Sequence, residues 1–404
     1  MNRHLRLVKL EEWLKPFTEM STFARASFLI IALVLPAQAQ TFNDAINRAL
    51  FGPPTGPINP SKGPSCQNST GNLLIRICAA AGQPGSSSGS TTALSNEISP
   101  IDERKVQRLI GPLNVFISGE YERFDKNVTK FEPGYQTNSG RAFIGADYSF
   151  NERFLVGGLL KYARDSGNFD SVPIASGSNV IVPGGHFHTD SYGPLFYANF
   201  VPAPKFFIST AAGYTRYDYF INRVASVTGI DGIIGPTDGN TDGNEFKAGV
   251  NGGYDFNFNS ITIGPRLGLN YKYNEIVGYR ERGSTGLELI YKNQYENSLT
   301  TLLGVYGSAA ISTGFGVVLP QTSLEYVHEF LDPQRKIRVS FVEDLNRVPF
   351  SFQNDPPDRN YFKLGAGILL VLPHGFSPFV NYRALIGYNN QSSHIATVGV
   401  RIEF

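Results

Sequence analysis

The chain has little charge of either sign and almost no cysteine. Charged residues make up 17% of its 404 residues, and 35 basic residues stand against 34 acidic ones. Because neither sign dominates, the charge gives no reason to expect a nucleic-acid partner. In an exported chain we expect the two cysteines, Cys66 and Cys78, to form a disulfide worth about 3 kcal/mol, with two free thiols as the alternative.

Recognisable catalytic and cofactor motifs are also missing. There is no HExxH, CxxC or phosphate-binding loop, and the GxSxG match at residues 85–89 lies in a Ser/Gly tract without a strand before it. His186 and His188 would share one strand face, and we interpret them as rim histidines in water rather than as a metal site. His328 and Glu329 fall on opposite faces of a strand. We therefore predict no enzyme activity, no cofactor and no metal.

Long apolar runs are limited to the N-terminus. Residues 26–35 are nearly all apolar, follow several basic residues and precede an Ala-Gln-Ala motif. This run is too short to span a bilayer, so we predict a signal peptide over residues 1–39, cleaved between Ala39 and Gln40. Met20 is an alternative initiator. Because no other stretch suits a membrane helix, a mature chain in a membrane would have to cross it as strands.

The predicted mature chain begins with a segment of low complexity. Residues 40–99 are rich in Gly, Pro, Ser, Thr and Asn, and about 60 such residues cannot bury much of a core, so we expect a mostly disordered segment or linker. A short helix and linker are expected at residues 100–111, with Ser99 as the N-cap and Gly111 at the end. Residues 112–404 have the composition and alternation of strands.

Alternation of apolar and polar residues with a period of two predicts twelve strands. The terminal strand is typical, because one face is continuously apolar and the other is mostly small or charged, as expected between lipid and a polar lumen. The predicted strands at 206–219 and 298–312 show no clear division into an apolar and a polar face. The predicted strands are 113–124, 140–150, 154–164, 186–201, 206–219, 244–258, 261–278, 298–312, 316–330, 361–372, 376–388 and 394–404.

Tight turns and long loops alternate between the predicted strands. Membrane barrels built from hairpins show this asymmetry, with tight turns on the periplasmic side and long loops outside. Residues 337–342 could form a further strand, but an odd total would break the alternation, so we place them in the longest outer loop. The prediction is an all-β fold, a twelve-stranded antiparallel up-and-down transmembrane β-barrel with a short N-terminal helix in the lumen.

The inward faces of the predicted strands carry charges of both signs. Such a wall could line a channel and hold the helix at residues 100–111 through salt bridges, or its charges could pair across the strands and stabilise the wall. The predicted lumen-facing residues are Arg141, Asp147, Lys161, Glu245, Lys247, Asp255, Arg266, Lys272, Glu325, Glu329, Lys363, Arg383, Arg401 and Glu403.

Three stretches near the C-terminus resemble the β-domain of the autotransporters, the type V secretion family. They are QTSLEYVHEF at 321–330, NYFKLGAGI at 360–368 and the terminal TVGVRIEF ending in Phe404. The resemblance covers roughly residues 100–404. It implies a twelve-stranded outer-membrane barrel with a helix through its lumen, and it implies that the outer-membrane assembly machinery reads Phe404 as an assembly signal.

The resemblance also implies a function and a location. A Gram-negative outer-membrane translocator would carry or display its short N-terminal segment through its pore and would have outer-membrane lipid, the assembly machinery and periplasmic chaperones as partners. Residues 40–99 are much shorter than the usual passenger of the family, and residues 100–110 contain no Asn for self-cleavage at an Asn-Asn bond. Two alternatives remain, a barrel whose long external loops bind host or surface ligands, as a small adhesin would, and a narrow diffusive pore.

Overall fold

The computed structural model describes most of the predicted strand region. The signal peptide, the segment 40–99, the helix at 100–111 and Phe404 lie outside the described residues, as do both cysteines. The described ranges are 113–129, 131–151, 153–173, 181–182, 184–203, 205–226, 234–331 and 336–403.

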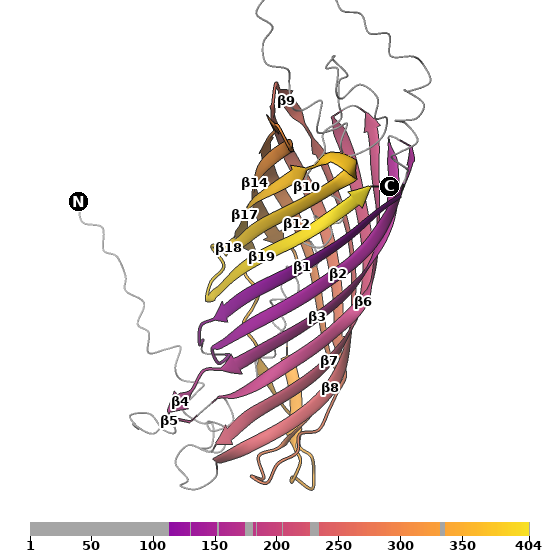
Figure 1. Ribbon diagram of the computed structural model, residues 1–404. Coiled ribbons are helices and arrows are strands. Elements are labelled where there is room, and N and C mark those ends of the chain that lie inside the picture. The colour runs from indigo at the N-terminus through magenta and orange to yellow at the C-terminus, as the bar shows by residue number, and fades with distance from the viewer. Residues whose placement is uncertain are drawn as a thin grey trace, which may run out of the picture.

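Twelve antiparallel strands close into a barrel, as predicted (Figure 1). Strands adjacent in the sequence are neighbours in the wall, and β19, yellow in Figure 1, pairs along its length with the indigo β1. The wall strands are β1 (Leu113–Lys126), β2 (Tyr135–Asn151), β3 (Phe154–Phe169), β6 (Gly185–Ala203), β7 (Phe206–Ser226), β8 (Ile234–Tyr254), β10 (Ile261–Ile276), β12 (Gln294–Ala309), β14 (Gly316–Glu329), β17 (Asn360–Val371), β18 (Phe376–Ile386) and β19 (Gln391–Glu403).

Close approach of the strands at the closing seam requires a glycine. A Cβ atom at Gly399 would lie 2.5 Å from the ring of Phe379 and 2.7 Å from the Cβ of Ser118. These two residues belong to β18 and β1, the neighbours of β19 on either side. Only a residue without a side chain therefore lets the three strands pack at this point.

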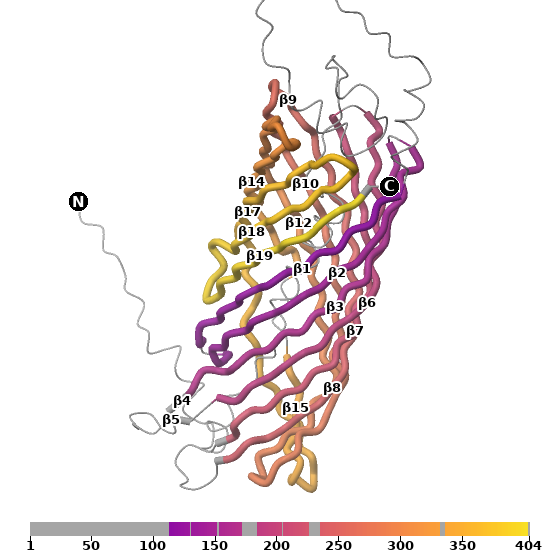
Figure 2. The backbone as a smooth tube through the Cα atoms, in the orientation of Figure 1, coloured from indigo at the N-terminus to yellow at the C-terminus, as the bar shows by residue number. Residues whose placement is uncertain are grey.

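Shorter elements occupy the two ends of the barrel. At the end with tight turns, β9 (Phe256–Phe258), β13 (Ile311–Thr313) and the 3-10 turn η4 (Pro373–Gly375) continue or join the wall strands. At the other end, β4 (Val172–Pro173) pairs with β5 (Ile181–Val182), and β11 (Leu289–Tyr291), β15 (Lys336–Phe341) and β16 (Phe350–Gln353) form a separate sheet. Figure 2 shows β9 at the upper, short-turn end and β4, β5 and β15 toward the lower, long-loop end.

The tight turns suit their residues. Asn259 has a φ of 54°, in the left-handed region that Asn tolerates better than most residues, and His374 has a φ of 64° immediately before Gly375. The side chain of Asn151 accepts a hydrogen bond from the amide of Arg153 at 2.8 Å. Among the described residues, no helix is both long enough and apolar enough to cross a membrane.

The structure differs from the predicted strands mainly at the long-loop end. β2 begins at Tyr135 and not at residue 140, β7 continues to Ser226, and β8 begins at Ile234 and not at residue 244. The Gly-, Asn- and Asp-rich start of β8 has low intrinsic strand propensity, but it pairs in unbroken register with β7. Residues 336–341 do form a strand, β15, but it pairs with β11 and β16 outside the wall.

A ring of tyrosines divides the outward face of the wall into an apolar and a polar zone. Their hydroxyl groups hydrogen-bond to polar side chains, for example Tyr162 to Asp190 at 2.8 Å and Tyr214 to Asn244 at 2.6 Å. On the short-turn side of the ring the outward residues are mostly apolar, whereas on the long-loop side they are mostly polar, such as Asp218 and Asp242. Such a ring is typical of a membrane interface. The other hydrogen-bonded members of the ring are Tyr121, Tyr271, Tyr326 and Tyr382.

Candidate functional site

The lumen contains a buried charge cluster around Arg141 on β2. Its guanidinium donates to Glu120 at 2.8 Å and to Glu122 at 2.5 Å, and it lies 3.7 Å from Asp165 on β3. None of these four side chains is more than 5% exposed. The hydroxyl of Ser393 on β19 donates to Glu122 at 2.6 Å, so the cluster spans the seam where the barrel closes. The ion pairs with Arg141 and the hydrogen bond from Ser393 lower the cost of burying these charges.

A second group of charges lies on β8 and the neighbouring strands. The Lys247 ammonium contacts Glu245 at 2.7 Å, and the hydroxyl of Tyr217 donates to the same carboxylate at 2.7 Å. Lys161 on β3 lies over the Tyr217 ring, with its ammonium 5.8 Å from the ring centroid. The two groups therefore line β1, β2, β3, β7 and β8 with polar side chains that face the same interior.

On β10 and β12, Lys272 pairs with Glu296 at 2.5 Å. Glu329 on β14 accepts hydrogen bonds from the hydroxyl of Ser298 at 2.5 Å and from the amide of Leu299 at 2.9 Å. This bonding extends the polar lining to the opposite side of the wall.

A third group lies toward the short-turn end of the lumen. Asp147 accepts hydrogen bonds from Asn114 at 2.7 Å, Tyr197 at 3.0 Å and Arg401 at 2.6 Å. Because Arg401 belongs to β19 and Asn114 to β1, this carboxylate also binds across the closing seam.

Arg266 binds both a carboxylate and aromatic rings in the same region. Its guanidinium donates to Asp255 at 2.5 Å and lies 4.9 Å from the centroid of Phe207. A planar guanidinium suits this combination of ion pair and ring stacking.

The remaining predicted lumen residues are on β14, β17 and β18. Glu325 and Lys363 occupy paired positions of β14 and β17, and the Lys363 ammonium lies 5.9 Å from the Tyr361 ring centroid. Arg383 on β18 alternates with outward-facing Tyr382 and Ala384, which places it on the lumen side. Only the backbone of Glu403 is described, opposite Asn114.

The sequence reasoning missed several acidic partners of these basic residues. Glu120, Glu122, Asp165 and Glu296 were not among the predicted lumen residues, yet each forms an ion pair there. Glu120 and Glu122 alternate with Tyr121 within a predicted strand, so their shared face was readable from the sequence. Asp165 and Glu296 lie just outside the predicted strands, which end at residue 164 and begin at residue 298. They were therefore not assigned to a strand face.

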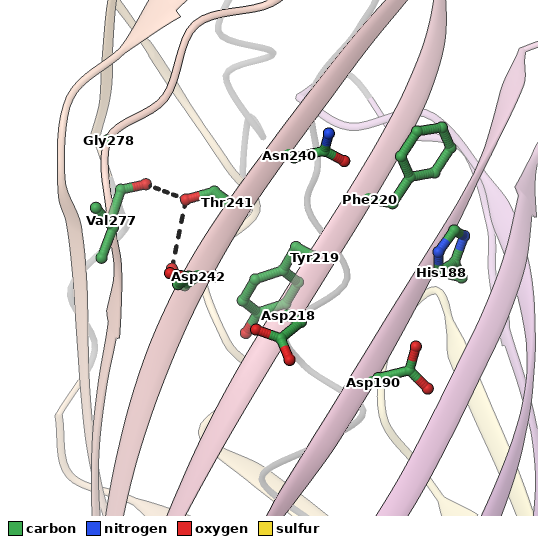
Figure 3. Close-up of a pocket in the computed structure, with 10 residues that line it drawn as sticks. All are labelled: His188, Asp190, Asp218, Tyr219, Phe220, Asn240, Thr241, Asp242, Val277 and Gly278. Atoms are coloured by element: carbon green, nitrogen blue, oxygen red, sulfur yellow. Dashed lines mark hydrogen bonds between the residues drawn. The ribbon is translucent and has the colours of Figure 1, made fainter.

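A groove lies on the wall beyond the tyrosine ring, between β6, β7, β8 and β10 (Figure 3). It has a volume of about 490 Å³ and includes three carboxylates, of which Asp242 pairs with Arg216 at 2.8 Å and Asp190 lies 3.6 Å from Arg164. The ring of His188 stacks on Phe220 with the centroids 4.8 Å apart. The residues that Figure 3 labels are His188, Asp190, Asp218, Tyr219, Phe220, Asn240, Thr241, Asp242, Val277 and Gly278.

Within the described ranges, no group of three or more His, Cys, Asp or Glu side chains could hold a metal ion. His186 and His188 point outward and lie against Phe220, with ring centroids 5.8 Å and 4.8 Å from it. His328 points outward toward Asn360, whereas the adjacent Glu329 points into the lumen.

Comparisons with known proteins agree with this architecture. The profile of the family described as autotransporter β-domain matches residues 115–383. The translocator domain of the autotransporter NalP from Neisseria meningitidis is 15% identical, with a TM-score of 0.57 over 75% of this chain and 95% of that one. The β domain of the Bordetella autotransporter Brka is 19% identical, with a TM-score of 0.52 over 72% and 100% of the two chains. No curated protein matches the sequence significantly.

Proposed function

Because the chain belongs to the autotransporter β-domain family, we propose that it is an outer-membrane translocator that carries or displays its own short N-terminal segment. The family makes the barrel a translocator of outer-membrane type. The observation that best supports transport of a polypeptide is the lumen wall, where charges of both signs are paired with one another. A polypeptide also carries donors and acceptors of both kinds, and such a wall favours neither a cation nor an anion.

In this proposal the segments outside the described residues have defined roles. The signal peptide is removed between Ala39 and Gln40, and residues 40–99 are the cargo, closed into a loop by a disulfide between Cys66 and Cys78. Residues 100–111 form a helix in the lumen, where the acidic and basic side chains of the helix form ion pairs with charged residues of the wall. The assembly machinery recognises Phe404 after periplasmic chaperones have delivered the chain.

Protease shaving of whole cells tests the display of the cargo. We expect an added protease to remove an epitope placed between Cys66 and Cys78 while the outer membrane stays intact. Cells with a permeabilised outer membrane serve as the control for cleavage from the periplasmic side. Protection of the epitope in intact cells, with cleavage only after permeabilisation, would rule out display.

A surface-binding role for the long-loop end is the second candidate. It is supported by the groove around Phe220, which combines carboxylates, an amide and stacked rings on the polar part of the wall. If the shaving experiment finds the N-terminal segment only in the periplasm, surface binding becomes the better-supported function, because binding by the barrel needs no displayed segment.

A further inference from the structure

The inner wall at the long-loop end is aromatic, unlike the charged lumen below it. Rings from neighbouring strands contact one another, for example Tyr135 and Phe169 with centroids 6.1 Å apart and Phe169 and Phe187 at 5.1 Å. A layer of buried rings cannot line an open aqueous mouth without a large hydrophobic cost. The layer consists of Phe124, Tyr135, Phe169, Phe187, Tyr217 and Tyr219, none more than 8% exposed.

Two loops from the opposite arc of the barrel cover this layer. They are residues 277–293, between β10 and β12, and residues 336–359, between β14 and β17; together we call them the lid. The lid contains the sheet of β11, β15 and β16, and its apolar side chains join the same buried cluster as the rings of the wall. The buried lid residues in the cluster are Tyr279, Leu289, Tyr291, Ile337 and Val339.

The lid has a defined internal structure. Tyr279 and Tyr291 stack with centroids 4.4 Å apart and an interplanar angle of 7°. Burial, with the neighbouring Tyr279 and Glu281, raises the pKa of the Tyr291 hydroxyl well above its usual value. Glu288 accepts hydrogen bonds from the amide and the hydroxyl of Thr285, and although burial acts in the opposite direction, these bonds lower its pKa below the usual value. The lid is therefore a folded unit with its own polar and aromatic contacts.

Two ion pairs, one buried and one partly buried, connect the lid to the wall. Arg223 on β7 donates to both carboxylate oxygens of Glu281 at 2.6 Å. Lys126, at the end of β1, contacts Asp355 of the lid at 2.7 Å and also Glu132, between β1 and β2, at 2.8 Å. The backbones of Asp238 on β8 and Arg282 exchange two hydrogen bonds of 2.8 Å, which tether one side of the lid. Loss of one partner from a buried ion pair is strongly destabilising, so these pairs are suited to hold the lid in place.

We propose that the lid is a gate that seals the long-loop mouth of the barrel when docked and that opens by separating from the aromatic layer. Arg223–Glu281 and Lys126–Asp355 act as its latches, while the Asp238–Arg282 bridge keeps the lid attached. This proposal concerns the barrel alone and holds whether or not the N-terminal segment is the cargo.

Thiol labelling of the purified full-length chain in detergent tests the gate. The reporter is Ser191→Cys on β6, 1% exposed and facing Tyr217 of the aromatic layer, in a background with Cys66→Ser and Cys78→Ser. The reagent is a maleimide carried on poly(ethylene glycol), and the mouth is its expected route to position 191 because side chains fill much of the interior of a small barrel. We expect very slow labelling of the chain with an intact lid.

Latch variants of the reporter protein should label faster. Glu281→Gln leaves the buried Arg223 without its counter-charge, and we expect the labelling rate to rise about 100-fold because the lid opens more often. Asp355→Asn should raise the rate less, because Lys126 keeps its ion pair with Glu132 at 2.8 Å. Asp218→Asn, an exposed carboxylate on the other face of the same wall, is the matched control and should leave the rate unchanged.

Replacement of residues 337–352 by a short Gly-Ser linker removes β15 and β16 except for their outermost residues and leaves the latch residues in place, and it too should expose the thiol. Fast labelling with the intact lid would overturn the proposal, as would a rate unchanged by both latch substitutions and by removal of the strands. If one variant fails to fold, the intact chain and the other variants still decide the result.

Discussion

At the scale of single residues, the sequence predicts which side chains face the lumen. It does not predict which of these side chains pair with one another. Period-two alternation is enough to assign Arg141 and Lys247 to one face of their strands. It says nothing of register, and register decides that Arg141 lies beside Glu120 on β1. It also cannot show that Asp147 binds Arg401, because these two residues come from opposite ends of the strand region and meet only in the closed barrel.

Removal of the Arg141 charge should destabilise the barrel strongly. Arg141→Leu leaves the buried carboxylates of Glu120 and Glu122 without their cation, and we expect a loss of about 3–5 kcal/mol in the free energy of unfolding. Denaturant titration of the protein in lipid vesicles measures this loss. Arg216→Leu is the matched control, because its ion pair with Asp242 is about half exposed and should contribute less than about 1 kcal/mol. Equal losses for the two variants would contradict this account of the lumen.

At the scale of the strand, the sequence predicted the number and order of the wall strands but not their full length. The apolar outward face of β10 alternates cleanly from Ile261 to Tyr273, which made that strand easy to identify. Residues 235–244 of β8 lack such a face, because they lie beyond the tyrosine ring. There the outward side chains no longer need to be apolar and the inward ones no longer need to be polar. Their strand structure comes from pairing with β7, a tertiary contact that local propensity does not encode.

The tyrosine ring should also mark a boundary for charged substitutions on the outward face. Leu267 is 62% exposed on the lipid side of β10, and Leu267→Arg should reduce the free energy of unfolding in vesicles by about 2–4 kcal/mol. Asn240→Arg places the same side chain outward on β8 but beyond the ring, where the cost should be about 0–1 kcal/mol. A large loss for Asn240→Arg would mean that the apolar zone extends beyond the tyrosines.

At the scale of the whole molecule, the barrel consists of two zones with opposite polarity. In the zone between the tyrosine ring and the tight turns, the outside is mostly apolar, and the inside carries the paired charges beside smaller apolar clusters around Phe143 and Leu369. Beyond the ring the outside is polar, and the inside packs Phe124 and Phe187 against Ile337 of the lid, as in a water-soluble sheet sandwich. The lid could not be predicted from the sequence, because its contacts join two long loops to strands that are distant in the chain.

The two-zone arrangement predicts how the barrel blocks the passage of ions. In the proposals above, the segment at residues 100–111 occupies the charged lumen and the lid closes the mouth, so two barriers act in series. Ions pass only when both are open, because resistances in series are dominated by the larger one. We therefore expect the intact chain, a variant lacking residues 40–111 and a variant lacking the lid strands at 337–352 all to show little steady current in planar bilayers.

Only the double variant should conduct, with long-lived open states. Their conductance should be limited by the width of a twelve-stranded barrel whose inner wall carries charged side chains. Unheated gel electrophoresis should first show that all four proteins are folded barrels. Large currents from the intact chain would contradict both barriers. Large currents from one deletion alone would identify the segment removed as the barrier that matters, and the other segment would then have to serve a different purpose.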